Sequence, residues 1–67
     1  MNMKLENENL LSALENTKKE LAIAHSGYQF ATSKEEIDYY IYQIKASQSK
    51  FAHILNQIKR LENLTQI

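Results

Sequence analysis

The sequence predicts an all-α protein, in which two amphipathic helices joined by a short turn fold back into an antiparallel, coiled-coil-like hairpin. Three observations support this fold. The 67-residue chain has no proline and one glycine, so little in it interrupts a helix. Hydrophobic residues recur three and four positions apart in two long stretches. A helix-start signal at Ser33 separates the two stretches.

The first helix is expected over about residues 8–31. Residues 1–9 are polar and rich in asparagine, so we expect them to fray, which leaves residues 10–67 as the hairpin domain. The rest of the stretch is rich in Ala, Leu, Glu and Lys, which are strong helix formers. One face carries the apolar positions Leu10, Leu14, Leu21, Ala24 and Tyr28, with Leu11 and Ala31 on its flanks.

The turn is expected at about residues 32–33. Ser33 followed by Glu36 forms a capping box, in which the serine oxygen accepts a backbone N–H three residues on and the glutamate reaches back. Gly27 offers a rival boundary, because it could end the first helix early as a left-handed cap. Tyr28 and Ala31 continue the apolar stripe beyond it, so the sequence favours a helix that runs through Gly27.

The second helix is expected over about residues 34–64 and carries the cleaner stripe. A seven-residue repeat joins Ile37, Ile44, Phe51 and Ile58; Tyr40, Ile54 and Leu61 follow three residues later, and Ile41 and Leu55 widen the face. This spacing is typical of a seam against a neighbouring helix.

A tight turn at residues 32–33 makes facing residues sum to about 65 in number. Leu14 then faces Phe51 and Leu21 faces Ile44, so large apolar side chains meet along the hairpin. Thr17 falls opposite Ser47 and Gln48. These polar groups either form a layer inside the seam that fixes the register, or point outward and stay hydrated; the sequence leaves both open.

A chain of this length struggles to bury enough apolar surface by itself. It has no cysteine, which removes disulfides and cysteine-based zinc sites as means of stabilisation. We therefore expect a homodimer in which two hairpins pair into a four-helix bundle. The second helix has a weaker apolar face for this purpose, formed by Tyr39, Tyr42, Ala46 and His53, and we expect Ile41 and Leu55 to help this face in self-association. This face either closes the homodimer or binds another protein.

No catalytic, metal or cofactor site is expected. His25 and His53 would lie about 20 Å apart along the hairpin at 1.5 Å per residue, and no Asp or Glu precedes either by three positions. No serine occupies a Gly-x-Ser-x-Gly elbow. The sequence thus predicts a non-enzymatic protein–protein interaction module. The alternative is a nucleic-acid-associated accessory protein using Lys45, Lys50 and Lys59 with Tyr42, although the net charge of zero does not favour it.

Residues 14–59 resemble the YaaL-like family, small bacterial proteins of unknown function. The resemblance rests on Lys18-Lys19-Glu20-Leu21 and, more strongly, on Ile37-Asp38-Tyr39-Tyr40-Ile41-Tyr42. It implies a short helical protein of the cytoplasm without a known activity or cofactor. It also adds Asp38 to the candidate interaction surface, because Asp38 matches the family pattern while lying off the seam. The N-terminus does not read as a signal peptide, and no apolar run approaches the ~18 residues of a membrane span.

Overall fold

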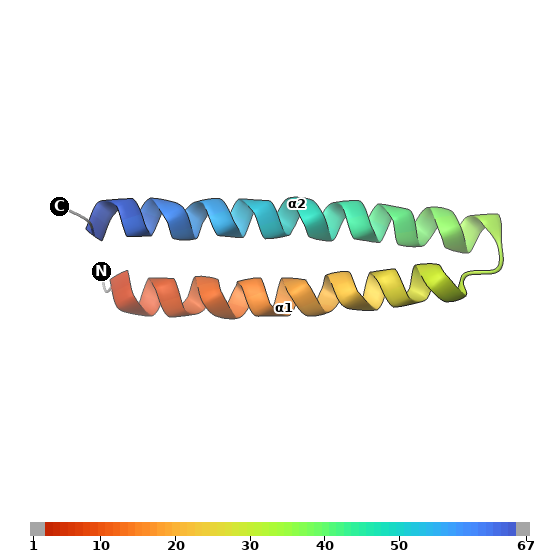
Figure 1. Cartoon of the computed structure of the whole chain (residues 1–67), viewed down its shortest axis with the longest axis horizontal. Coiled ribbons are helices and arrows are strands. Elements are labelled where there is room, and N and C mark those ends of the chain that lie inside the picture. The colour runs from red at the N-terminus through yellow and green to blue at the C-terminus, as the bar shows by residue number, and fades with distance from the viewer. Residues whose placement is uncertain (1–2, 66–67) are drawn as a thin grey trace.

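The protein is a two-helix antiparallel hairpin, as the sequence predicts. The computed structural model describes the backbone of residues 3–65 and the side chains of residues 6–63. Helix α1 covers Met3–Phe30, a short connection follows, and helix α2 covers Lys34–Thr65. The two helices run side by side along the whole rod, which measures 52 × 15 × 14 Å, and the start of α1 and the end of α2 lie at the pole opposite the turn (Figure 1).

The turn is fixed by local hydrogen bonds around Ser33. Its hydroxyl accepts the backbone N–H of Glu36 at 3.1 Å, which confirms the first half of the predicted capping box. The reciprocal half differs: the Glu36 carboxylate accepts the hydroxyls of Ser33 at 3.1 Å and Thr32 at 3.4 Å. The carboxylate thus ties both turn residues to the first turn of α2.

Helix α1 runs through Gly27 to Phe30, so the favoured alternative is confirmed. Gly27 has no left-handed backbone conformation. At its other end, α1 begins at Met3 rather than near residue 8. Its early turns have a packing partner, because Glu6 and Leu10 line a common depression with Gln57, Arg60 and Leu61 of α2. Fraying of the first nine residues in solution stays a prediction.

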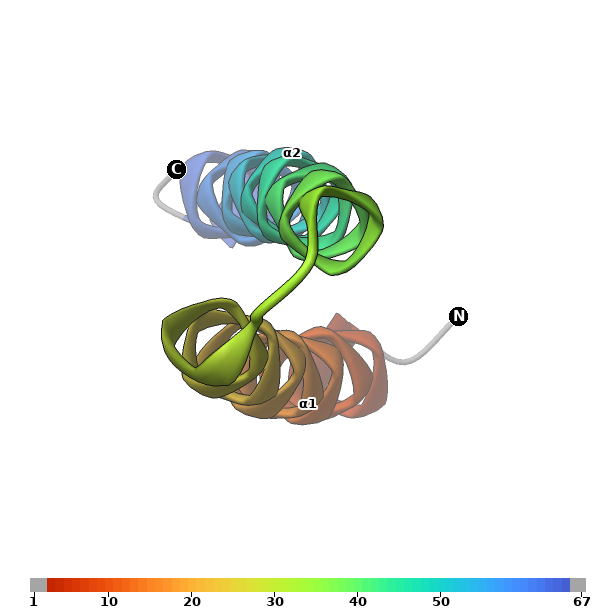
Figure 2. The same cartoon turned by 90° about the vertical axis from the view of Figure 1, so that its right-hand side faces the viewer.

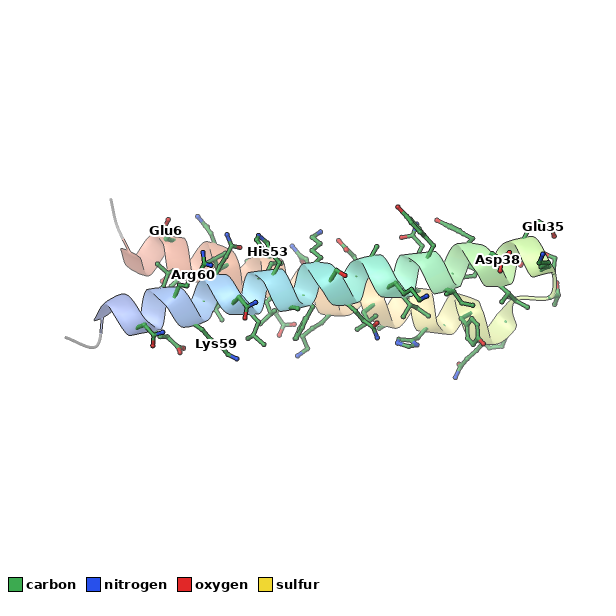
Figure 3. All side chains as sticks on the ribbon, turned by 90° about the horizontal axis from the view of Figure 1, so that it is seen from above. Glu6, Glu35, Asp38, His53, Lys59 and Arg60 are labelled. Atoms are coloured by element: carbon green, nitrogen blue, oxygen red, sulfur yellow. The ribbon has the colours of Figure 1, made fainter. Side chains whose placement is uncertain are left out.

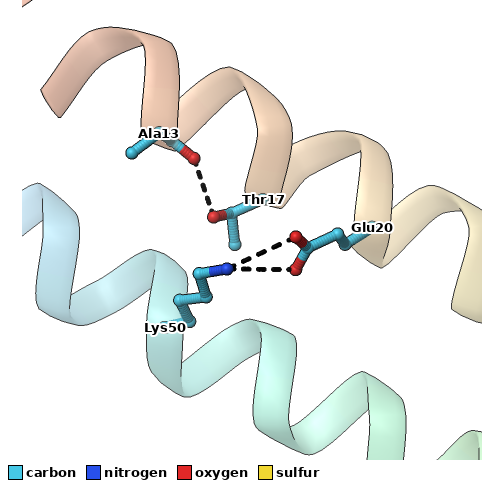
Figure 4. A network of polar contacts seen from close by, with 4 residues as sticks. All are labelled: Ala13, Thr17, Glu20 and Lys50. Atoms are coloured by element: carbon cyan, nitrogen blue, oxygen red, sulfur yellow. Dashed lines mark hydrogen bonds and ion pairs between the residues drawn. The ribbon is translucent and has the colours of Figure 1, made fainter. Parts of the chain in front are cut away.

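The centre of the seam is made of small and polar side chains. Thr17 is 0% exposed and Ser47 is also buried, so the polar pair lies inside the seam rather than in water. The Thr17 hydroxyl donates to the carbonyl oxygen of Ala13 in its own helix at 2.8 Å (Figure 4). Because the bond is internal to α1, burying this hydroxyl requires no partner on α2. Gln48, expected beside Ser47, is exposed.

The large apolar side chains enter the seam less completely than expected. Among the described side chains, the buried hydrophobic residues are Ala24, Ile54 and Ile58. Leu14, Leu21, Ile44 and Phe51, expected to meet across the seam, are all half-buried. The end view in Figure 2 shows the reason: residues 3–65 form only two helices, so no further element covers either side of the pair.

The contact between Gly27 and Tyr40 shows the register in which the two helices pack. A Cβ atom built on Gly27 would fall within 3.0 Å of three atoms of the Tyr40 ring. Gly27 therefore faces a residue two positions further along α2 than the rule of about 65 places it. The absence of a side chain on Gly27 is what lets the ring lie directly on the α1 backbone.

Candidate interaction surface

The five residues that the sequence singles out lie on the outside of α2. Asp38, Tyr39, Tyr42, Ala46 and His53 are all exposed, and Tyr42 is 70% exposed. Figure 3 looks onto this outer side, with Asp38 near the turn and His53 further along α2. At 3.6 residues per turn, the five positions fall within about 100° of the circumference of α2. We call these five residues the outer strip; its role in binding stays a prediction.

Tyr39 has a second role that the other outer-strip residues lack. Its ring stacks on that of Tyr40, with the ring centroids 5.1 Å apart and the planes 8° from parallel. The same two rings line a shallow depression of about 200 Å³ together with Ile23 and Ala24 of α1. Tyr39 therefore braces the Tyr40–Gly27 contact near the turn, and about half of it, 51%, stays exposed.

The side of the hairpin that carries this depression combines polar groups with apolar ones, including Ile23, which is 70% exposed. Glu20 of α1 and Lys50 of α2 form an ion pair across it, with Nζ 3.3 Å from one carboxylate oxygen and 3.4 Å from the other (Figure 4). Gln43 and Gln57 also line depressions here. Because Lys50 is engaged with Glu20, the basic set proposed for nucleic-acid contact is not a group of free cations.

The opposite side of the hairpin is apolar. A shallow groove of about 350 Å³, lined almost only by carbon atoms, lies between Lys18, Leu21, Ala22 and His25 of α1 and Phe51 of α2. The helical period places further large apolar residues on the same side as this groove. We call this set the apolar flank: Leu11, Leu14, Leu21 and Tyr28 of α1 with Ile37, Ile41, Ile44, Phe51 and Leu55 of α2.

Each apolar-flank residue is partly in water. Leu11, Tyr28 and Ile37 are exposed, and the other six are half-buried. Sequence reasoning gave Ile41 and Leu55 a part in self-association, but it assigned the other seven residues to the seam between the helices or its edge and so missed them as a surface. The available signal was a pair of smaller residues seven positions apart, Thr17 and Ala24, which marks the centre of the buried face of α1. With that pair innermost, Leu14 and Leu21 must lie to one side.

No constellation for chemistry emerges from the described part of the chain. Within it, no three His, Asp or Glu side chains gather closely enough to hold a metal ion. His25 lies in the apolar groove, whereas His53 is on the outer strip. Neither helix, over residues 3–65, contains an apolar stretch of the length that a membrane span requires.

Comparison with known proteins identifies a family without an assigned activity. Searches of curated proteins and of solved structures found no significant match. A family model described as "protein of unknown function (DUF2508)" matches residues 2–63, which include both helices almost entirely. The chain therefore belongs to the DUF2508 family of proteins of unknown function.

Proposed function

We propose that this chain is a non-catalytic helical module for protein–protein interaction, and that it associates with a second copy of itself. The observation that carries the proposal is how much surface the hairpin exposes. Its accessible surface is 5377 Å² for 7.8 kDa, whereas compact monomers of this mass expose about 4,400 Å². The excess of about 1,000 Å² follows from the elongated shape.

The dimensions support the same proposal. The radius of gyration is 15.5 Å, against about 11 Å for a compact domain of this length. A rod two helices thick has little interior, which is why so few of its hydrophobic residues are fully buried. Pairing two such rods into a four-helix bundle supplies the missing interior, because each hairpin then covers one side of the other.

Sedimentation equilibrium from low to high micromolar concentration tests the proposal. We expect a mass of two chains at the upper end, and a helical circular dichroism signal that weakens on dilution, because folding and association are coupled. A fully helical monomer that persists at all concentrations would overturn it. Native mass spectrometry provides an independent measure of the stoichiometry.

We also infer that the chain belongs to the narrower YaaL-like group and acts in the bacterial cytoplasm. The support is the segment Ile37-Asp38-Tyr39-Tyr40-Ile41-Tyr42, which matches that group's pattern. Fractionation of the source cell, followed by detection of the chain in the soluble or membrane fraction, tests the location.

A further inference from the structure

We infer that the apolar flank, and not the outer strip, is the surface on which the second copy docks. The inference rests on the self-association proposed above and specifies the interface. A surface used for association should be apolar, continuous and large enough to hold two chains together. The apolar flank meets these conditions in ways that the other sides of the rod do not.

The sides of the rod differ in how much it costs to remove them from water. The groove between Leu21, Ala22 and Phe51 is lined almost only by carbon. The opposite side carries the Glu20–Lys50 ion pair, which would have to lose its hydration to be covered. The outer strip, apart from its tyrosines, presents a carboxylate, an imidazole and the small side chain of Ala46. Desolvation therefore costs least on the apolar flank.

The hairpin exposes about as much excess surface as a dimer interface would bury. A stable interface of standard size buries about 800 Å² on each partner. The surface that the whole hairpin exposes beyond a compact monomer, about 1,000 Å², is close to the amount that such an interface would remove from water. From the central groove the flank extends toward the chain ends through Leu11 and Leu55, and toward the turn through Tyr28 and Ile37. It thus runs along most of the rod.

The occupant that fits best is an identical chain. A two-fold interface uses the same patch on both partners. A groove near the middle of the rod therefore lies close to the same groove of the second copy, and each copy contributes its whole apolar flank to the interface. The net charge is zero, so two copies approach without net repulsion. At the groove's rim, Lys18 already has an acidic neighbour, Glu15, at 3.7 Å, so its charge is partly balanced within the same chain.

Two exposed alanines allow a matched test. Ala22 lines the apolar groove, whereas Ala46 lies on the outer strip; both are exposed positions inside helices. Substitution by glutamate changes helix propensity little at either site. We expect Ala22→Glu to raise the dimer dissociation constant at least about 100-fold, because each copy would have to remove a charged carboxylate from water. Ala46→Glu should leave the constant within about threefold of wild type.

Sedimentation equilibrium on the full chain gives the constants, and circular dichroism at high concentration checks the helical content of each variant. Ala22→Lys should weaken the dimer as Ala22→Glu does, because burial of a charge matters here rather than its sign. Dissociation by Ala46→Glu with no effect at Ala22 would assign the interface to the outer strip and overturn this inference, while leaving the proposed function intact. Equal, small effects at both sites would also overturn it. A monomeric wild-type chain would overturn the proposed function itself.

Discussion

Replacing Gly27 with alanine sets two effects of similar size against each other. Alanine in a helix interior is favoured over glycine by about 0.8–1.0 kcal/mol, because glycine loses more backbone freedom on folding. The new methyl group, however, would lie within 3.0 Å of three atoms of the Tyr40 ring. The ring would have to move, and it is stacked on Tyr39 at 5.1 Å. Overpacking of this kind costs about 1–3 kcal/mol.

We therefore expect Gly27→Ala to lower the free energy of unfolding by about 1 kcal/mol. In a Tyr40→Ala background, where the ring is gone, the same change should raise it by about 1 kcal/mol. The coupling between the two sites is then about 2 kcal/mol. Urea titrations followed by circular dichroism, at one fixed protein concentration because association adds to stability, give the four values.

The neighbouring Ser26→Ala is the control for helix propensity. Ser26 is exposed, so its substitution should have the same small effect whether or not the Tyr40 ring is present. If Gly27→Ala stabilised the protein equally in both backgrounds, the ring would not occupy the space above Gly27. The alignment of the helices derived from that contact would then be wrong.

Three further predictions concern polar groups, each measured as a free energy of unfolding by urea titration. Ser33→Ala should lower the free energy of unfolding by about 1 kcal/mol, because it removes the cap of α2. Ser33→Thr should retain most of the stability that the cap provides. No loss of stability with alanine would show that the cap does not stabilise the turn. Thr17→Val should change stability by less than about 1 kcal/mol, because the hydroxyl bonds only within its own helix; a loss above about 2 kcal/mol would reveal a bond to α2. Lys50→Ala should cost less than about 1 kcal/mol, since both partners of its ion pair are half exposed, and the cost should shrink in high salt.

The sequence alone predicts those features of the structure that depend on residues close together in the chain. Ser33 and Glu36 are three positions apart, so their hydrogen bond follows from helix geometry and the turn could be located in advance. Ser47 and Thr17 could not be assigned in the same way. Whether a hydroxyl is buried depends on how it is satisfied, and the bond from Thr17 to Ala13 becomes visible only with the rotamer.

Apart from Ile41 and Leu55, the apolar flank was not predicted to be a surface, for a related reason. A hydrophobic pattern shows which residues avoid water, but it does not show how wide a strip one neighbouring helix can cover. In a pair of helices that strip is narrow, and Leu21 and Phe51 remain at its edge. The buried residues that fill it are Thr17, Ala24, Ser47, Ile54 and Ile58. By contrast, the exposure of Tyr42 and His53 follows from their positions opposite the seam, and the structure agrees.

The placement of the aromatic side chains has a practical consequence for spectroscopy. The chain has four tyrosines and no tryptophan. Given the bounds of the two helices, all four tyrosines lie in the half of the rod that ends at the turn: Tyr28, Tyr39, Tyr40 and Tyr42. Tyrosine fluorescence and near-ultraviolet dichroism therefore report on that pole, whereas far-ultraviolet dichroism averages over both helices. A difference between the two melting curves would show directly which pole of the hairpin opens first.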